Sequence, residues 1–239
     1  MLVEELAARA WPAAEAERVD GWLLRRTPAL TRRRSNSALP VDGDGAPDPG
    51  VVEGFYARHG GRALVQIAPA EAWAQLDAEL ARRGWATEGP TDVLVAAADT
   101  VLAHTPPGDV AIAPRPDARW IATWAACEGR PDADKHAREV LARIEPETGY
   151  ALAAGGAGVG LAVCERGWAG LFCVATAERA RRRGVARAVV HALTRWAAER
   201  GAQRIYLQVE SDNAAAHALY GSAGFSRSHG YHYRVGPRA

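Results

Sequence analysis

The segment that most constrains the fold is residues 170–200, where a short apolar run leads through a glycine- and arginine-rich turn into a long helix. Residues 170–174 read GLFCV, which is typical of a buried strand. Beyond the turn, apolar side chains recur at intervals of four, four and three, at Val185, Val189, Leu193 and Trp196. That spacing places them in one stripe along a helix, which Gly201 ends. A strand that turns into a striped helix predicts helices layered on a sheet.

The turn itself has the character of an anion site. The first N–H groups of a helix have no partner within the helix, and the helix dipole adds partial positive charge there. The turn therefore predicts binding of a diphosphate at the helix start. Four side chains would add charge: Arg181, Arg182, Arg183 and Arg187. An arginine-rich helix start is also typical of a solvated surface, and this pattern alone leaves both interpretations open.

The rest of the chain alternates strand and helix patterns. Strands are expected at residues 21–26, 32–39, 62–67, 91–97, 150–154, 160–165, 204–209 and 231–235, and helices at 1–10, 70–83, 120–127, 134–144, 184–200 and 213–223. Residues 155–160 read GGAGVG and lack the Gly-Lys-Ser/Thr ending of a phosphate loop, so we expect a tight hairpin turn there. The pattern predicts an α/β fold of the α+β type, with a mixed, mostly antiparallel sheet flanked by helices.

Two segments rich in turn-forming residues divide the chain. Residues 40–50 predict a long loop, and residues 104–117 predict a linker that leads into a first strand of the second half. We place the domain boundary near Thr105, which gives domains at 1–105 and 110–239. A chain of 239 residues has room for two small domains.

Composition narrows the possible partners. The net charge of +1 gives no global reason to expect nucleic acid or an anionic membrane as partner. Cys127, Cys164 and Cys173 lack the number and spacing of a disulfide scaffold or a zinc site, so we expect no metal and a reducing, cytoplasmic setting. Residues 1–10 predict an amphipathic helix and no signal peptide, and no apolar run has the length to span a bilayer.

Two motifs in the second half resemble those of the GCN5-related N-acetyltransferase superfamily. The cofactor-loop pattern Gln/Arg-x-x-Gly-x-Gly/Ala is matched by residues 181–186, RRRGVA. A downstream pattern, Asn-x-x-Ala-x-x-Leu-Tyr-x-x-x-Gly-Phe, is matched at Asn213, Ala216, Leu219, Tyr220, Gly224 and Phe225. The two motifs are separated by one helix and one strand, as in the family. The resemblance spans residues 110–235.

The resemblance implies an acyltransferase fold and acetyl-CoA as cofactor. The backbone N–H groups of Arg182, Arg183, Gly184, Val185, Ala186 and Arg187, with the side chain of Arg181, would bind the pyrophosphate of coenzyme A. The strand end at Cys173, Val174 and Ala175 would pair with the pantetheine arm and polarise the thioester carbonyl. This strand would splay from residues 204–209, and Asn213 would hold the far end of the cofactor.

Catalytic roles follow from the same resemblance. Tyr220 would be the general acid that protonates the departing thiolate, although a helix tyrosine of this kind also packs in cores. The general base differs among family members and is not fixed by a motif. Our first candidate is Glu210, at the end of the expected strand 204–209. Glu165 comes second, followed by His229 and His232, and each of these residues is also consistent with a surface charge or a packed histidine.

The implied activity is transfer of an acetyl group from acetyl-CoA to a primary amine of a small molecule or peptide, by direct attack in a ternary complex. Two other functions remain open. One is a non-catalytic acyl-CoA-binding or regulatory module, and the other is O-acylation of a hydroxyl group. The sequence does not identify the acceptor, because fold says little about substrate.

The first half has a weak likeness to the second. A shift of 140 residues aligns Leu76, Leu80, Gly84 and Trp85 with Ala216, Tyr220, Gly224 and Phe225. We therefore interpret residues 1–105 as a degenerate acetyltransferase-like half that has lost its cofactor site. Its basic segment, residues 32–36, is expected either to bind an acidic substrate group and help wall the acceptor pocket, or to protect a strand edge with charge.

Overall fold

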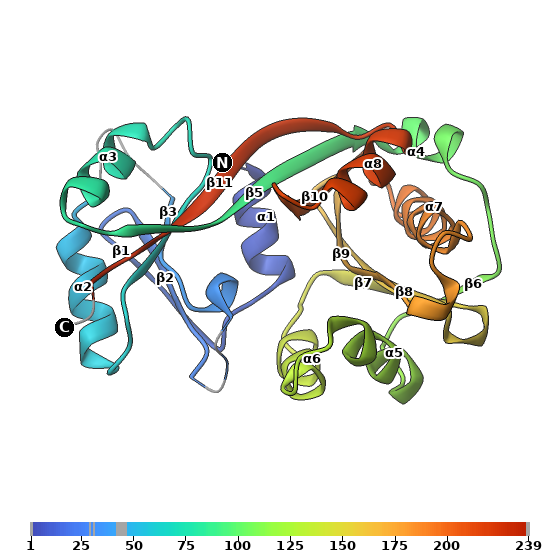
Figure 1. Cartoon of the computed structure of the whole chain (residues 1–239), viewed down its shortest axis with the longest axis horizontal. Coiled ribbons are helices and arrows are strands. Elements are labelled where there is room, and N and C mark those ends of the chain that lie inside the picture. Colours follow the sequence, from blue (N-terminus) through green and yellow to red (C-terminus); the bar gives the residue numbers. More distant parts are fainter. Residues whose placement is uncertain (1, 29, 31, 42–46, 238–239) are drawn as a thin grey trace. The chain divides into compact units, whose positions relative to one another are not determined.

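The striped helix α7 (Val185–Ala198) belongs to the second of two units into which the chain folds. The computed structural model describes all residues except 1, 29, 31, 42–46 and 238–239 (Figure 1). One unit comprises Met1–Val93, Glu210–Asp212 and Ser228–Ala239, and the other comprises Leu94–Val209 and Asn213–Arg227. The first unit thus has its main part up to Val93 and also includes Ser228–Ala239. The domain boundary near Thr105 stays a prediction.

The second unit is built on a sheet with antiparallel neighbours and one parallel pair. Its hydrogen-bonded order is β10-β9-β8-β7-β6, and the end of β5 lies on the other side of β10. The bounds are β6 (Val110–Ala113), β7 (Glu147–Ala153), β8 (Gly158–Glu165), β9 (Trp168–Thr176) and β10 (Arg204–Glu210). Only the pair β9–β10 is parallel within this order. The predicted mixed, mostly antiparallel sheet is confirmed.

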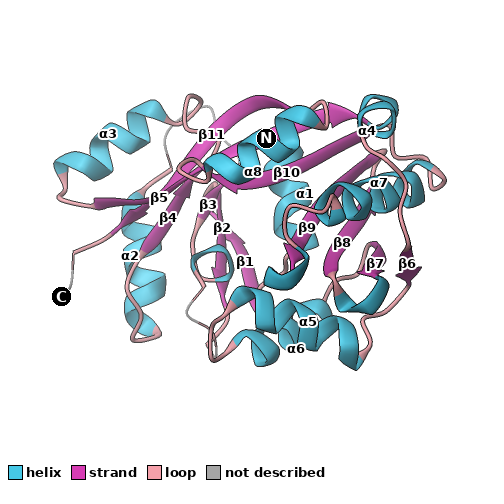
Figure 2. Cartoon of the chain, turned by 45° about the vertical axis from the view of Figure 1, so that its right-hand side comes forward, coloured by secondary structure: helices cyan, strands magenta, loops and turns pink. Residues whose placement is uncertain are grey.

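Helices cover both faces of this sheet. Helix α7 lies on one face, where it contacts β6, β7, β8 and β9 (Figures 1 and 2). Helix α5 packs on β7, β8 and β9, and α6 packs against α5. Besides α7, the α-helices of the described part of this unit are α4 (Ala98–His104), α5 (Ala118–Glu128), α6 (Ala133–Leu141) and α8 (Ala214–Ser222).

The apolar stripe of α7 forms the centre of this unit's core. Val189 and Leu193 are fully buried and pack with Ala162 and Leu171 of the sheet. The approach is close because β8 presents Gly160 to the helix. A Cβ on Gly160 would lie 2.8 Å from both Leu193 Cδ1 and Val189 Cγ1. On the side of α5, the indole Nε1 of Trp120 donates to the Gly160 carbonyl at 3.2 Å.

The first unit has its own core around buried Trp22, Leu76, Leu80 and Trp85. Strands β1, β2 and β3 form an antiparallel sheet, and β4 pairs with β11 in antiparallel register. A parallel bridge between Ala38 and Val65 links the two sets. The bounds are α1 (Leu2–Ala10), β1 (Glu15–Val19), β2 (Trp22–Arg26), β3 (Leu39–Pro40), α2 (Pro49–Arg58), β4 (Leu64–Ile67), α3 (Ala74–Arg82), β5 (Ala86–Ala97) and β11 (Ser226–Val235).

The local geometry repeats at the 140-residue shift. Helices α3 and α8 begin and end at matching positions, and each is followed by a glycine with positive φ, 78° at Gly84 and 88° at Gly224. The next residue then donates back to the helix in both places, Trp85 to the Leu80 carbonyl and Phe225 to the Tyr220 carbonyl, each at 3.0 Å.

Some local expectations were wrong. Residues 32–39 form no long strand. A short 3₁₀ helix occupies Arg33–Ser35, and β3 covers Leu39–Pro40 alone. The cause is Asn36, whose side-chain amide donates to the carbonyls of Leu30 and Arg32 and whose Oδ1 accepts from Thr27 N. These bonds compete with a strand ladder.

Four further elements differ from expectation. The loop expected at residues 40–50, of which 42–46 lie outside the described part, gives way to α2 at Pro49. Asp48 caps this helix by accepting from Gly50 N. Helix α4 was not predicted, and β5 and β11 are longer than the runs at 91–97 and 231–235. The turn between β7 and β8 is confirmed as a tight connection, with a 3₁₀ turn at Ala154–Gly156.

Two other findings concern the described residues. None of their helices has both the length and the apolar character to cross a bilayer. Cys127, Cys164 and Cys173 form no disulfide.

The packing of α7 on Gly160 can be tested by adding one methyl group. We expect Gly160→Ala to lower the free energy of unfolding by about 1–3 kcal/mol, because the core must shift to admit the Cβ. The matched control is Gly221→Ala in α8, where a Cβ meets nothing within 4 Å. That change should raise stability by about 0.5–1 kcal/mol through helix propensity. Urea unfolding measures both, and equal effects at the two positions would contradict the packing described.

Candidate active site

The turn before α7 opens the helix on a glycine. Gly184 is the N-cap, with φ of 79°, and no side chain caps the helix. A left-handed residue at this point favours glycine, and a Cβ there would meet no atom within 4 Å. The N–H groups of the first turn therefore have no capping oxygen from a side chain. Val185, Ala186 and Arg187 supply the first of these groups.

The arginines of the turn divide into two kinds. Arg181, Arg182 and Arg183 are exposed, and no carboxylate in the described part of the chain pairs with any of them. Arg187 instead turns to the end of α4, where its Nη2 donates to the His104 carbonyl. Its side chain therefore braces two helices, and its backbone remains in the first turn. Three exposed cations beside uncapped helix N–H groups give this turn a strong local positive charge.

Strands β9 and β10 separate after a short paired region. Their parallel register covers Arg204 with Trp168, Ile205 with Ala169 and Tyr206 with Gly170. Beyond Gly170, β9 continues to Thr176 beside β8 alone. Gly170 is the last residue of β9 that pairs with β10. A side chain does not fit there, because a Cβ would lie 2.5 Å from Tyr206 Cζ. The separation predicted between these strands is present.

A β-bulge lies on β9 beyond the fork. Val159 faces Ala175 and Leu161 faces Phe172, so that Cys173 and Val174 together oppose Gly160. Cys173 has φ of 54°, a left-handed conformation that a non-glycine residue adopts rarely. Bulges leave the extra residue out of the ladder and re-aim the backbone around it. The backbone of Cys173, Val174 and Ala175 is therefore irregular where the cofactor arm was expected to pair.

Tyr220 lies in α8 and is 8% exposed. Its ring packs edge-on to Phe225, with centroids 5.7 Å apart, inside the core of the second unit. Burial raises the pKa of Tyr220 to about 12, so the hydroxyl holds its proton at neutral pH. A protonated phenol of this kind is able to act as a proton donor. The ring of Tyr220 also packs in the core, which was the alternative interpretation of this residue. Core packing of the ring is compatible with proton donation by the hydroxyl.

The candidate bases differ in their surroundings. Glu210 ends β10 and is exposed, while Glu165 ends β8 opposite Trp168 and is half-buried. His229 lies in the first unit, with its Nε2 2.6 Å from Oε1 of Glu4, whose side chain is 3% exposed. His232 Nε2 lies 2.7 Å from Asp77 Oδ1, which also accepts from Arg234 Nε.

Asn213 is the N-cap of α8, and its Oδ1 accepts from Ala216 N at 3.0 Å. The side-chain oxygen therefore stabilises the start of the helix that carries Tyr220. Its amide nitrogen is not needed for that cap.

Sequence reasoning missed two features of this region. The bulge has no turn signature of its own, because a cysteine occupies the left-handed position. Its only trace is the glycine-rich strand opposite, Gly158 and Gly160, which sequence patterns assigned to a hairpin turn. The contact between His229 and Glu4 joins residues that are far apart in the chain. The sequence indicated for Glu4 only a charged position on an amphipathic helix.

Comparison with known proteins gives a consistent result. The family model described as "Probable histone acetyltransferase Rv0428c C-terminal" matches residues 2–234. An uncharacterized N-acetyltransferase of Bacillus subtilis (strain 168), YobR, is 28% identical over 98% of this chain and 97% of its own length.

Solved structures share the fold at low identity. A GCN5-related N-acetyltransferase from Kribbella flavida superposes with a TM-score of 0.70 at 16% identity, over 99% of this chain and 94% of its own. A tandem GNAT protein from the clavulanic acid biosynthesis pathway gives a TM-score of 0.64 at 12% identity, over 100% of this chain and 89% of its own.

The burial of Tyr220 predicts a pH dependence of stability. Because the folded pKa of about 12 exceeds the ordinary value of 10.0, the folded state holds the proton more tightly than the unfolded chain. This contribution to stability is complete below about pH 10 and is lost as the pH rises through about 12. Urea midpoints measured across this range should fall more steeply for the wild type than for Tyr220→Phe. Parallel curves for the two proteins would show that the hydroxyl is solvated.

Proposed function

The chain belongs to the family of the probable histone acetyltransferase Rv0428c C-terminal region, within the GCN5-related N-acetyltransferase superfamily, and from this premise we propose that it acetylates a primary amine of a small molecule or peptide with acetyl-CoA. The family is one of acyltransferases. Use of acetyl-CoA, the amine as acceptor and direct attack in a ternary complex are our proposals.

The observation that carries the proposal is the start of α7 at Gly184, which no side chain caps, together with the bulged end of β9, where the pairing with β10 has stopped. A coenzyme A pyrophosphate carries negative charge and many acceptor oxygens. It fits a turn that combines exposed N–H groups with the three exposed cations Arg181, Arg182 and Arg183. The backbone N–H groups from Arg182 to Arg187 would bind it, and the backbone of Cys173, Val174 and Ala175 would pair with the pantetheine arm.

The cofactor supplies an acetyl thioester, whose carbonyl carbon accepts the amine nitrogen as the carbon–sulfur bond breaks. A backbone N–H at Val174 or Ala175 stabilises the oxygen of that carbonyl as negative charge develops. The amine loses one proton, and the sulfur gains one. These two proton movements define the roles of the acid and the base.

Tyr220 donates the proton to the sulfur. Its hydroxyl stays protonated at neutral pH, and a thiolate is a modest base that needs a proton only as its bond breaks. Glu210, exposed at the end of β10, remains the first candidate for the base. Glu165, His229 and His232 follow. The contact with buried Glu4 holds the imidazole of His229 in place.

We propose that residues 1–105 are a degenerate copy of the catalytic half, and that the catalytic domain is residues 110–239. The repeated hydrogen bonds at the 140-residue shift support this duplication. Its helix α2 is poorly suited to a diphosphate, because Asp48 already occupies Gly50 N with a carboxylate. Leu80 stands where the second copy has Tyr220. A single cofactor site follows from these differences.

Cofactor binding is tested at the helix start. We expect acetyl-CoA to raise the Tm of the wild type, and Gly184→Val to abolish this shift because a β-branched residue is strained at φ of 79°. The double variant Arg181→Ala/Arg183→Ala should weaken binding at least about tenfold, the equivalent of about 1.4 kcal/mol. Arg195→Ala, a surface change on the far end of α7, is the control. Unchanged melting shifts in all variants would refute the pyrophosphate assignment.

Turnover is tested with the acid and base variants. Thiol release from acetyl-CoA over a panel of amines should fall about a hundredfold or more in kcat for Tyr220→Phe, with cofactor binding retained. The loss of kcat in Glu210→Gln should become smaller as the pH approaches the pKa of the amine, because an amine that is already unprotonated needs no base. The defect of Tyr220→Phe should show no such recovery.

The same assay separates the other functions. Cofactor binding without turnover on any acceptor would favour a non-catalytic acyl-CoA-binding module. Turnover on alcohols alone would favour O-acylation.

A further inference from the structure

Three polar side chains are hydrogen-bonded in series between helix α1 and strand β11, within the first unit. Oε1 of Glu4, on α1, lies 2.6 Å from Nε2 of His229. The other ring nitrogen of His229, Nδ1, lies 3.1 Å from Oγ of Ser228. The imidazole therefore connects a carboxylate on one side to a hydroxyl on the other.

The carboxylate of this series is buried. The side chain of Glu4 is 3% exposed, and α1 buries it together with Val3, Leu6 and Ala7. Its Oε2 accepts no hydrogen bond within the described residues, so the contact of Oε1 with His229 is the interaction that holds the carboxylate. Burial of a carboxylate is strongly unfavourable without such a partner. The imidazole and the carboxylate are therefore held together in one arrangement.

The contact with Glu4 determines which nitrogen of the imidazole carries the hydrogen. A contact as short as 2.6 Å is typical of a hydrogen bond to an ionised carboxylate, which is able only to accept. Nε2 is then the donor, and Nδ1 of the neutral ring is left as an acceptor. The hydroxyl of Ser228 therefore donates to Nδ1. This is the direction in which its proton must move to make the oxygen a nucleophile.

Exposure to solvent decreases along the series from the hydroxyl to the carboxylate. Ser228 is exposed, the side chain of His229 is 13% exposed, and Glu4 is buried. A nucleophile must be reached by its substrate, whereas the group that orients the base is buried in known hydroxyl–imidazole–carboxylate sites. The order of exposure in the first unit is the same.

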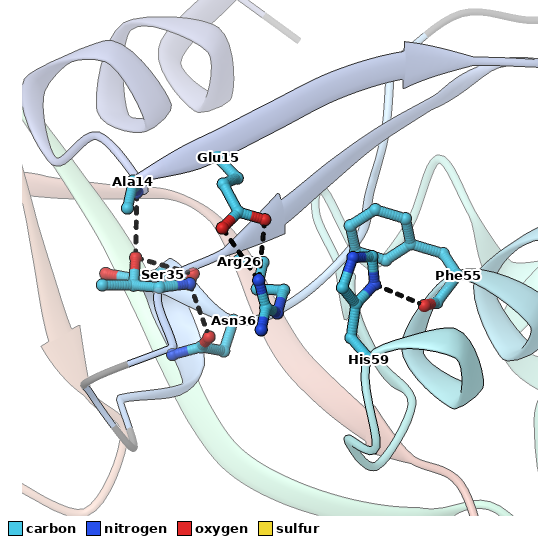
Figure 3. Close-up of polar contacts among 8 residues, drawn as sticks. Ala14, Glu15, Arg26, Ser35, Asn36, Phe55 and His59 are labelled. Carbon is cyan, nitrogen blue, oxygen red and sulfur yellow. Dashed lines mark hydrogen bonds and ion pairs between the residues drawn. The ribbon is translucent and has the colours of Figure 1, made fainter.

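The other two histidines of the first unit have different partners. Nδ1 of His59 lies 2.8 Å from the Phe55 carbonyl at the end of α2 (Figure 3). Nε2 of His232 lies 2.7 Å from Oδ1 of Asp77, a carboxylate that also binds an arginine. Within the described residues of this unit, only the ring of His229 joins a hydroxyl to a carboxylate.

We propose that Ser228 is a nucleophilic serine that is acylated by activated acyl esters, with His229 as its base and Glu4 as the residue that positions the imidazole. Oγ attacks the carbonyl carbon of the ester, and the hydroxyl proton passes to Nδ1. The bond from that carbon to the leaving oxygen breaks, and the proton passes from the ring to this oxygen. The products are an acyl-serine and an alcohol.

The position of Ser228 indicates the class of acyl donor. A site that is open to water stabilises a developing oxyanion poorly, so it suits an ester whose leaving group departs readily. All three residues belong to the first unit, and the proposal does not rest on the transferase activity proposed above.

The test uses the full chain and 4-nitrophenyl acetate, without acetyl-CoA. In acid-quenched samples, we expect peptide mass spectrometry to find an acetyl group on Ser228, formed faster than any adduct on Lys135, the single lysine of the chain. Ser228→Ala should lose the rapid release of 4-nitrophenolate. Ser226→Ala, which changes an exposed serine two residues earlier on β11, should keep it. An unmodified Ser228 in the wild type, or unchanged release in Ser228→Ala, would overturn the proposal.

The imidazole and the carboxylate have separate readouts. His229→Ala should slow acetylation of Ser228 about a hundredfold, and added imidazole should restore part of the rate because it replaces the missing base. Glu4→Gln should slow acetylation at least about tenfold, because a glutamine amide no longer fixes the hydrogen on Nε2, and Glu4→Asp should retain more of the rate. Acetylation of Lys135 should be the same in all of these variants.

An unchanged rate at Ser228 in His229→Ala or Glu4→Gln would contradict the assigned roles, and so would a loss in His229→Ala that imidazole does not restore. If a variant of the buried pair does not fold, the exposed changes Ser228→Ala and Ser226→Ala decide the question, since equal release of 4-nitrophenolate by these two proteins would overturn the proposal.

Discussion

The close packing of α7 against β8 is the constraint on which the rest of the second unit depends. The fully buried side chains Val189 and Leu193 sit 2.8 Å from the point where a Cβ of Gly160 would stand, so the helix is held at a fixed height over the sheet. The same glycine faces the bulge at Cys173 and Val174 and accepts a hydrogen bond from Trp120. One residue without a side chain thus sets the position of the helix, the irregularity of β9 and the anchoring of α5.

The two halves share one local hydrogen-bond pattern but differ at their helix starts. The backbone hydrogen bonds that end α3 and α8 are the same at a shift of 140 residues. The helix starts are not the same, since α2 begins at an aspartate and a proline whereas α7 begins at an uncapped glycine. Because an uncapped helix start favours an anion and a carboxylate cap disfavours one, we propose the anion site at α7 and none at α2.

The sequence predicted those parts whose signal is local and periodic. The stripe of α7, the mostly antiparallel sheet and the separation of β9 from β10 were all anticipated, the last through family resemblance. Features that depend on distant partners were not. The 3₁₀ turn at Arg33–Ser35 results from side-chain bonds of Asn36, the bulge at Cys173 results from the register with β8, and His229 meets Glu4 only in the folded chain. The buried position of Arg25 was not predicted either, because its hydrogen-bond acceptors, Ser37 and Gln66, lie far from it along the chain.

The pairing of β11 with β4 has a consequence for how the chain acquires its structure. Residues 232–235 are hydrogen-bonded to residues 64–67, and Arg62 Nε donates to the carbonyl of Gly236. Contacts of such long sequence separation slow folding, because the intervening chain must be ordered before they form. During synthesis the first unit therefore lacks one of its strands until Ser226–Val235 has left the ribosome. Strand β4 has no β11 partner for that interval, so the first unit completes its fold only after the residues of the second unit have been made.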